Sequence, residues 1–252
     1  RANLWSRIAS RVLWRVHEFD YAAEEDLYRA ARGVDWPRFF RVERTLRVNV
    51  TAQKSPLKSL EFATLRVKDA VCDHFREATG SRPSIDRAKP DVRVHAYLDD
   101  KSGALYLDTS GEPLFKRGWR TSEVDAPLRE NLAAGILRIA GWQPGMPLLD
   151  PMCGGGTFLL EAASLALGIP PGAQRGFGFE RLTIYDAATW RELRESADRN
   201  RQRMSKLPIF GSDRDPRAVG PKPPDSDSTC VSDKVPRSGS GTGPTREISP
   251  RT

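Results

Sequence analysis

The stretch DPMCGGGTFLLE, residues 150–161, decides the fold of the second half of the chain. It follows the short apolar run MPLLD and leads into TFLLEAASLALG, whose apolar side chains are typical of a buried helix. The preceding segment DAPLRENLAAGILRIAG begins with an Asp cap. Its helical spacing predicts an apolar face made of Leu128, Leu132, Ile136 and either Ile139 or Leu137. The order helix, strand, glycine loop, helix indicates the opening of a doubly wound α/β domain.

Three uses of this glycine loop can be compared. A phosphate-binding P-loop requires a lysine directly after its glycines, but Gly156 is followed by Thr157. The dinucleotide fingerprint requires a small residue three positions after its second glycine, where Leu159 is expected to push the helix away from the strand. A turn that passes close to the amino-acid end of S-adenosylmethionine fits better, because only glycine lets the backbone come so near to a ligand.

Two aspartates are candidate contacts in such a site. Asp150 ends the strand, where it can meet the ammonium group of the ligand, while amides at the helix start meet the carboxylate. PIFGSD is a second predicted strand, and its Asp213 can accept hydrogen bonds from ribose hydroxyls. Two alternatives stay open: the glycines can serve helix-strand packing alone, and Asp213 can be a helix cap. Cys153 is interpreted as a small apolar residue of the turn.

The residues before the segment GEPLFKRGWRTSEVD show the pattern of a separate α+β domain. The spacing of Leu4, Ile8 and Val12 predicts the tail of a helix over residues 1–11. Further helices are predicted at EEDLYRAARG and at residues 59–79. Strands of a small, mostly antiparallel sheet are predicted at RVLWRVHEF, TLRVNVTA, DVRVHAYLDD and ALYLDTS, the last two as a hairpin. Later in the chain, AATWRELRESADRNRQRMSKL is predicted to be one long polar helix.

Length and composition limit the class of protein. With 252 residues, of which 38% are hydrophobic, the chain can bury a core and is expected to form two domains. No apolar run is long enough for a membrane helix, and the first residues lack the layout of a signal peptide, so we expect a cytoplasmic protein. Cys72, Cys153 and Cys230 lie far apart, and the three histidines are equally scattered. Neither a disulfide framework nor a metal site is therefore expected.

The positive charge of the chain is concentrated in its first half. The net charge is +7, and residues 1–120 hold 23 Lys and Arg against 17 Asp and Glu. This half is the candidate surface for a polyanion, although an excess of this size also serves solubility alone. The segment GEPLFKRGWRTSEVD, at the end of this half, contains a basic-aromatic cluster of Lys116, Arg117, Trp119 and Arg120. The cluster can grip phosphate and stack on a base, or it can be a solvated linker.

Several sequence blocks occur together in one order: LWSRIASRV, VKDAVCDHF, RPSIDRAKPDVRV, LFKRGWR, APLRENLAAGIL, and DPMCGGGT followed by LLEAA. In these blocks the chain resembles the bacterial THUMP-domain methyltransferases of large-subunit ribosomal RNA, which modify the N2 amine of guanine. The resemblance covers about residues 1–219. The resemblance implies an α/β fold with a THUMP-type α+β RNA-binding domain at residues 1–115 and a basic linker at 116–124. An incomplete Rossmann-like methyltransferase domain is then expected at 125–219.

The same resemblance implies S-adenosylmethionine as methyl donor and large-subunit ribosomal RNA as substrate, without a metal. The cofactor-binding candidates are Asp150, Pro151, Cys153, Gly154, Gly155, Gly156, Thr157 and Asp213. The APLRE segment, residues 126–130, is expected beside the methionine end of the cofactor. The RNA-binding candidates are Arg87, Lys89, Lys116, Arg117, Trp119 and Arg120.

The chain departs from the family pattern at both ends. It starts inside an amphipathic pattern, without the strand and helix that open the family's first domain. The family's Asn-Pro-Pro-Tyr motif, which holds the target base, is absent, and residues 220–252 contain six prolines and almost no large apolar side chain. We therefore expect a truncated or frame-shifted chain with a disordered tail and weak or absent catalysis. An RNA-binding module without catalysis and a nonfunctional gene remnant are the alternatives.

Overall fold

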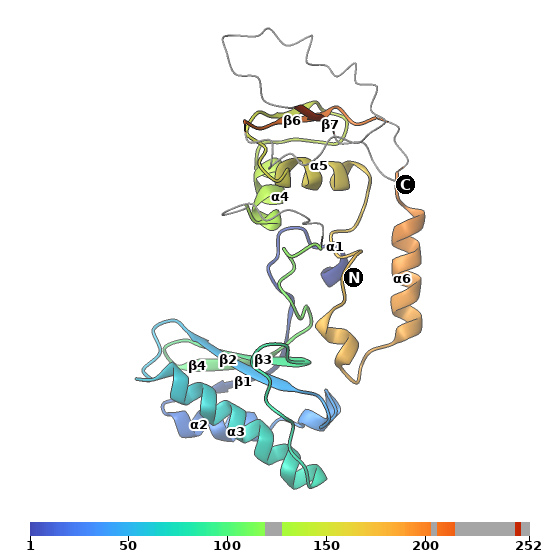
Figure 1. Cartoon of the computed structure of the whole chain (residues 1–252). Helices are drawn as coiled ribbons and strands as arrows, with labels where there is room; N and C mark the ends of the chain where they lie inside the picture. Colours follow the sequence, from blue (N-terminus) through green and yellow to red (C-terminus); the bar gives the residue numbers. More distant parts are fainter. Residues whose placement is uncertain (119–127, 203–205, 215–244, 248–252) are drawn as a thin grey trace. The chain divides into compact units, whose positions relative to one another are not determined.

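The computed structural model describes residues 1–118, 128–202, 206–214 and 245–247 of the chain (Figure 1). The chain divides into two compact units. The first, called the four-stranded unit, consists of residues 11–113 and 176–187, and the second, called the three-stranded unit, consists of residues 1–10, 114–175 and 188–252. This division differs from the expected linear order, because residues 1–10 belong with the second half of the chain and residues 176–187 with the first.

Backbone hydrogen bonds explain both exchanges. The amide of Gly172 donates to the carbonyl of Leu4 at 3.0 Å, which ties the first residues to the three-stranded unit. The amide of Thr183 donates to the carbonyl of Phe39 at 2.9 Å, and the amide of Phe179 donates to the carbonyl of Thr109 at 3.0 Å. These contacts join segments that are far apart in sequence, so patterns within short windows do not reveal them.

The four-stranded unit is built on one sheet with the strand order β1-β4-β3-β2. Strands β1 and β3 are both antiparallel to β4, whereas β2 is parallel to β3. The predicted hairpin and the predicted mostly antiparallel sheet are therefore confirmed. The strands are β1 (Leu13–Asp20), β2 (Leu46–Ala52), β3 (Val92–Leu98) and β4 (Ser102–Asp108).

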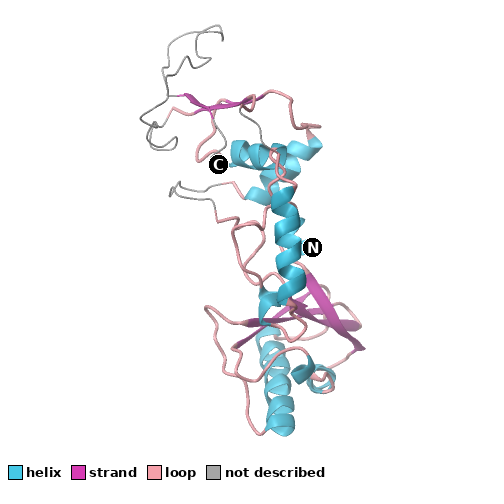
Figure 2. Cartoon of the chain, turned by 90° about the vertical axis from the view of Figure 1, so that its right-hand side faces the viewer, coloured by secondary structure: helices cyan, strands magenta, loops and turns pink. Residues whose placement is uncertain are grey.

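Two helices cover one face of this sheet, α2 (Glu24–Arg32) and α3 (Leu60–Thr79) (Figure 1). Figure 2 shows them on the same side of the strands from a direction turned by 90°. Helix α3 begins where the hydroxyl of Ser59 accepts the amide of Phe62, and it ends at Gly80, whose φ of 75° is left-handed. Both helices were predicted, and two short 3-10 turns, Trp36–Arg38 and Gly178–Arg181, complete the unit.

The core of the four-stranded unit lies between the helices and the sheet. Alternate strand residues point into it because side chains of a strand alternate between its two faces. The carboxyl half of α3 contributes Phe75, whose ring centroid lies 5.0 Å from that of Phe40. The fully buried strand residues of this core include Leu46, Val94, Ala96, Leu98, Leu105 and Leu107.

The three-stranded unit contains the segment around the glycine loop. Strand β5 pairs in parallel with β6, and β7 pairs antiparallel with β6. The predicted strand, glycine loop, helix and second strand are all present. The elements are α1 (Ala2–Trp5), α4 (Glu130–Ile139), β5 (Leu148–Asp150), α5 (Thr157–Ala166), α6 (Ala187–Arg199), β6 (Ile209–Ser212) and β7 (Thr245–Glu247).

Three expectations for helix ends and for the tail are corrected. Helix α1 ends at Trp5 because Ser6 is extended, so the helix predicted over residues 1–11 is much shorter. Helix α6 ends at Arg199 and does not continue through the whole polar segment. Residues 245–247 form a strand, which differs from the disorder expected for the tail.

The buried face predicted for α4 is only partly correct. Leu132 and Ile136 are exposed by 52% and 41%. Helix α4 buries Leu137, as predicted, together with Ala133 and Ala134, which were not predicted. Small alanine side chains let one helix approach another closely, and in this unit α4 packs beside α5. Among the described helices, none combines the length and the apolar character needed to cross a membrane.

Candidate functional site

The glycine loop lies between the end of β5 and the start of α5, and its backbone is held by bonds to β6. Gly154 and Gly156 have φ angles of 50° and 76°, a left-handed conformation that glycine adopts without strain. The amide of Cys153 donates to the carbonyl of Ser212 at 2.9 Å. The amide of Gly156 donates to the carbonyl of Cys153 at 2.8 Å and closes the turn before the helix.

The two candidate aspartates lie at neighbouring strand ends, as parallel pairing requires. Asp150 ends β5, and its Oδ1 accepts the amide of Met152 at 3.1 Å. Asp213 directly follows β6, and its Oδ2 accepts the amide of Gly154 at 2.8 Å. Asp213 therefore shapes the glycine loop as well as lying beside it, a contact that the sequence analysis did not anticipate.

A glycine that the sequence analysis did not select makes room for the helix. Leu159 is fully buried. A Cβ built at Gly211 of β6 would lie 2.3 Å from Cδ1 of Leu159 and 3.1 Å from Cβ of Cys153. The expectation that Leu159 pushes the helix away from the sheet is therefore wrong, since the absent side chain at Gly211 accommodates it. The signal was a glycine inside a predicted strand, which often marks close approach of another group.

The loop has features that suit the amino-acid end of a cofactor. A Cβ at Gly154 would meet no described atom within 4 Å, so that face of the loop is open. The first amides of a helix have no acceptor within the helix and carry the positive end of its dipole. Thr157 and Phe158 provide such amides in α5. Pro151 is exposed and Gly155 is half-buried, so both lie at the surface of the loop.

Cys153 is buried in the turn, as expected for a small apolar residue. Cys72 is also a buried free thiol, and burial raises its pKa. Among the described residues, which exclude Cys230, no group of three or more His, Cys, Asp or Glu side chains is placed to hold a metal ion.

The six RNA-binding candidates do not form one cluster. Arg117 must be corrected, because its side chain is only 1% exposed and forms an ion pair with Glu161 at 3.1 Å. Lys116, Arg87 and Lys89 are exposed. The remaining candidates of the segment, Trp119 and Arg120, lie outside the described residues, as do the first two residues of APLRE.

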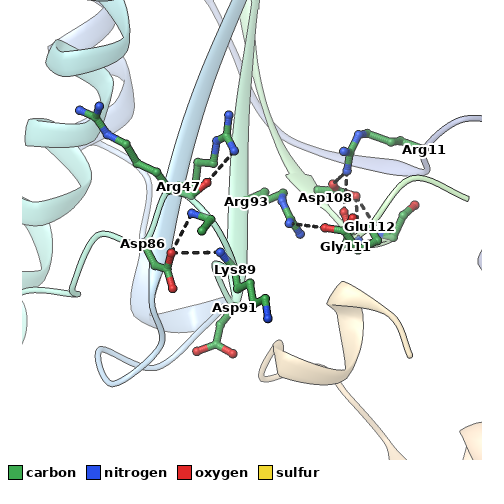
Figure 3. Close-up of polar contacts among 12 residues, drawn as sticks. Arg11, Arg47, Asp86, Lys89, Asp91, Arg93, Asp108, Gly111 and Glu112 are labelled. Atoms are coloured by element: carbon green, nitrogen blue, oxygen red, sulfur yellow. Dashed lines mark hydrogen bonds and ion pairs between the residues drawn. The ribbon is translucent and has the colours of Figure 1, made fainter. Parts of the chain in front are cut away.

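Lys89 lines a hollow of about 480 Å³ on the four-stranded unit. Figure 3 shows the polar side chains around it. Arg93 of β3 donates to Glu112 at 2.8 Å, and Arg181 donates from Nε to Oδ1 of Asp91 at 2.8 Å. The amides of Ala88 and Lys89 both donate to Oδ1 of Asp86, at 2.8 and 3.0 Å. These bonds fix the loop that carries Lys89.

The polar face of the sheet continues beside this hollow. Arg47 of β2 is the register partner of Arg93 on β3, so the two guanidinium groups project from neighbouring positions of the face that α2 and α3 leave uncovered. Arg47 donates to the carbonyl of Arg87 at 2.7 Å. Arg47, Arg93 and Arg181 were not selected from the sequence. The signal for Arg47 and Arg93 was the alternation of arginine with buried valine or leucine in LRV and VRV, whereas Arg181 lies in FERL, which has no such alternation.

Two carboxylates near the hollow have lowered pKa values. Burial raises the pKa of Asp91, but the Thr45 amide and the Arg181 guanidinium outweigh burial and hold the pKa below its ordinary value. Burial likewise raises the pKa of Asp108, and the hydrogen bond to His95 together with the charge of Arg11 outweighs it. Both carboxylates are thus ionised at neutral pH. The hollow combines Lys89, Arg93 and Arg181 with two acidic side chains, Asp91 and Glu112.

Two protein families match consecutive parts of the chain. Residues 21–108 match the THUMP domain, and residues 117–238 match the family described as RMKL-like, methyltransferase domain. The second match runs beyond residue 219, at which the resemblance was expected to end.

Two relatives, both described as ribosomal RNA large subunit methyltransferase K/L, come from Aliivibrio salmonicida and Aliivibrio fischeri. Each is 41% identical over 223 residues, which cover 87% of this chain and 32% of the relative. The chain thus spans about a third of the length of these relatives.

Solved structures show the same fold. A predicted N6-adenine-specific DNA methylase from Listeria monocytogenes aligns with a TM-score of 0.78 and 28% identity, over 87% of this chain and 58% of that one. The putative methyltransferase SMU.472, complexed with SAH, aligns with a TM-score of 0.76 and 32% identity, over 86% of this chain and 58% of that one. These neighbours confirm the predicted fold class, a THUMP domain followed by a Rossmann-like methyltransferase domain.

The close approach at Gly211 generates a testable prediction. Gly211→Ala places a Cβ against buried Leu159 and Cys153 and is expected to destabilise the three-stranded unit by about 1–3 kcal/mol, as overpacking does. Gly135→Ala in α4 is the matched control, because its new Cβ meets nothing within 4 Å and is expected to stabilise the helix by about 0.5–1 kcal/mol. Urea denaturation of both variants measures the difference. Equal stabilities would show that α5 does not pack closely on β6.

Proposed function

Because this chain belongs to the family that combines a THUMP domain with an RMKL-like methyltransferase domain, we propose that it binds S-adenosylmethionine at the glycine loop and methylates large-subunit ribosomal RNA. The observation that carries the proposal is the shape of that loop. Two glycines with left-handed φ permit the turn, and the loop is open at Gly154, near Asp150 and Asp213 at the carboxyl ends of two parallel strands. Ligands of doubly wound folds bind at this edge of the sheet.

The polar groups among the cofactor candidates have distinct roles in the proposed site. Asp150 would meet the ammonium group of the cofactor, and the first amides of α5 would meet its carboxylate. Asp213 would accept hydrogen bonds from the ribose. S-adenosylmethionine supplies, when bound, a methyl group on a positively charged sulfur. The residues of this chain hold the donor in place, and such positioning accounts for much of the acceleration of a bimolecular transfer.

The target atom is proposed to be the exocyclic N2 amine of guanine, as the family resemblance implies. The chain contains no Asn-Pro-Pro-Tyr motif, the element that would hold the base and align its amine. A cofactor loop without groups that present the base gives little advantage of orientation. We therefore propose that this chain, taken alone, transfers the methyl group weakly.

RNA binding is proposed for the four-stranded unit. Its sheet face and the adjoining hollow bring together Arg47, Arg87, Lys89, Arg93 and Arg181, and phosphate contacts by such side chains supply most of the affinity for nucleic acid. The second candidate function, an RNA-binding module without catalysis, is favoured by the same cluster together with the missing base-holding motif.

Methyl transfer itself is the direct test of the proposed reaction. The full chain is incubated with labelled S-adenosylmethionine and unmodified large-subunit ribosomal RNA, and the RNA nucleosides are then identified by mass spectrometry. We expect a slow gain of N2-methylguanosine, because the cofactor is held while the base is not. A different methylated nucleoside would contradict the proposed target atom, and rapid multiple-turnover transfer would contradict the proposed weak activity.

Cofactor binding separates the enzyme from the binding module. We expect calorimetry to detect binding of S-adenosylhomocysteine, and we expect Asp150→Asn to weaken it about tenfold or more, since a hydrogen bond to a charged group contributes about 1.5–3 kcal/mol. Asp198→Asn, an exposed carboxylate on α6, is the matched control and should leave the affinity unchanged. Absence of binding by the unaltered chain would leave only the RNA-binding module.

Salt-dependent binding tests the RNA face. Lys89→Ala and Arg47→Ala are each expected to weaken binding of a large-subunit ribosomal RNA fragment and to reduce the slope of log affinity against log salt by about one phosphate contact. Lys58→Ala serves as the control, because it also removes one exposed positive charge. Lys58 lies just before α3, the helix that covers the other face of the sheet. Fluorescence anisotropy at several salt concentrations measures all four proteins. Equal losses in the three variants would show that net charge alone, rather than this face, binds RNA.

A further inference from the structure

Helix α5 contains one buried charge in an otherwise uncharged sequence. Glu161 lies one turn after the start of the helix, and its side chain is 1% exposed. An ionised carboxylate loses its hydration on burial. This loss costs roughly several kcal/mol for each buried ion unless other groups replace the water. A buried acid at this position therefore requires counter-charges from elsewhere in the fold.

Two arginines supply them, one on each carboxylate oxygen. Nη1 of Arg7 lies 3.2 Å from Oε2 of Glu161, and Nε of Arg117 lies 3.1 Å from Oε1. Arg7 also donates to the hydroxyl of Ser164 at 2.8 Å and to the carbonyl of Ile169 at 2.6 Å. The side chains of Arg7 and Arg117 are 15% and 1% exposed. The three charged groups form a fixed cluster, the Glu161 cluster, and not a surface ion pair.

The two arginines come from the segments that connect the two units. The chain passes into the four-stranded unit after residue 10 and returns from it after residue 113, and Arg7 and Arg117 lie close to these two points. Nη2 of Arg117 donates to the carbonyl of Arg7, and the amide of Leu114 donates to the carbonyl of Ser10 at 2.8 Å. Both connecting segments are thereby joined to each other and to one carboxylate of α5.

The same helix determines the position of the glycine loop. The carbonyl of Gly156 accepts the amide of Leu160, so the loop leads into the first turn of α5 without a break. Leu159 of this turn packs over Gly211, and Asp213 holds the amide of Gly154. Any rotation of α5 about its axis would therefore move the loop relative to β6.

We propose that Glu161 is a positioning residue that fixes α5, and with it the Gly154–Gly156 loop, to the two segments connecting the units. The role of the loop as a cofactor site rests on the proposed function. The attachment of α5 and the loop to Arg7 and Arg117 does not. It makes the cofactor site dependent on Arg7 and Arg117, which touch no residue of the loop in the described structure.

The electrostatics agree with this role. Burial raises the pKa of Glu161, and the charges of Arg117 and Arg7 limit the rise. Burial lowers the pKa of Arg7, the attraction of Glu161 opposes this, and the neighbouring Arg117 adds to the lowering. Removing the carboxylate charge leaves two guanidinium groups close together without a counter-ion, so the connecting segments are expected to separate from α5.

The test compares Glu161→Gln with Leu167→Ala. Leu167, the residue after the last turn of α5, is a buried core residue whose side chain takes part in none of the described polar bonds of the Glu161 cluster, so its truncation removes stability and leaves those bonds in place. Hydrogen exchange of the cofactor-free chain reports on residues 153–160, and calorimetry gives the affinity for S-adenosylhomocysteine.

We expect Glu161→Gln to accelerate exchange at residues 153–160 and to weaken S-adenosylhomocysteine binding about tenfold, within the range found for residues that couple distant sites. Leu167→Ala should lower the melting temperature with little change in either measurement. Equal effects of the two variants, or no effect of Glu161→Gln, would overturn the proposal, because a merely stabilising cluster would act through global stability.

Arg7→Met covers the case in which Glu161→Gln does not fold. It leaves the ion pair of Arg117 and Glu161, whose charges balance, and detaches only residues 1–10 from Glu161. Faster hydrogen exchange at residues 153–160 is again expected. Unchanged exchange would refute the proposed role of Glu161 in positioning the loop. If the unaltered chain does not bind S-adenosylhomocysteine, the proposed function fails. Hydrogen exchange without cofactor then still decides whether Glu161 positions the loop.

Discussion

A buried carboxylate needs counter-charges that are also buried, and in the three-stranded unit this requirement determines which segments come together. The partners of Glu161 are 154 and 44 positions away in the sequence, at Arg7 and Arg117. The two arginines bring the first ten residues and the return from the four-stranded unit to one carboxylate of α5. Together with the bond between Gly172 and Leu4, this contact explains why residues 1–10 group with the second half of the chain, although they directly precede β1. Breaking one member of such a cluster costs more than the pair contributes, since the remaining charges stay buried.

The glycine loop illustrates a second dependence on distant residues. Its two left-handed glycines permit the turn, but the bonds that fix the turn come from β6 and the residue after it, through Ser212 and Asp213. A carboxylate offers about four lone-pair sites, so the bond from Gly154 is compatible with a second acceptor role for Asp213. One aspartate can thus shape the loop and also accept a ribose hydroxyl. The proposed cofactor site is therefore a property of two adjacent parallel strands, and the motif is only its first half.

The sequence predicted the elements whose signal is local and failed where the deciding partner is distant. Strand alternation and helical spacing are local, so the four-stranded sheet, α2, α3 and the β5-loop-α5-β6 order were predicted correctly. Arg117 looked like an exposed RNA contact because nothing near it in sequence reveals Glu161. The buried face of α4 was predicted only in part, with Leu132 and Ile136 in place of Ala133 and Ala134, because large apolar side chains were given priority over the small ones that permit close packing on α5. Gly211 was overlooked since its importance depends on Leu159, which lies in another element.

The register of the sheet bears on the choice between RNA binding and simple solubility. Like charges at neighbouring positions of adjacent strands destabilise a sheet, yet Arg47 and Arg93 are register partners. Glu112 neutralises Arg93, whereas the acceptors that the described structure gives Arg47 are the neutral oxygens of Asn49 and Arg87. Solubility requires positive charges only somewhere on the surface and gives no reason to place two of them side by side at this cost. A polyanion would compensate the remaining charge, so the pairing of β2 with β3 supports an RNA-binding face more directly than the net charge of the domain does.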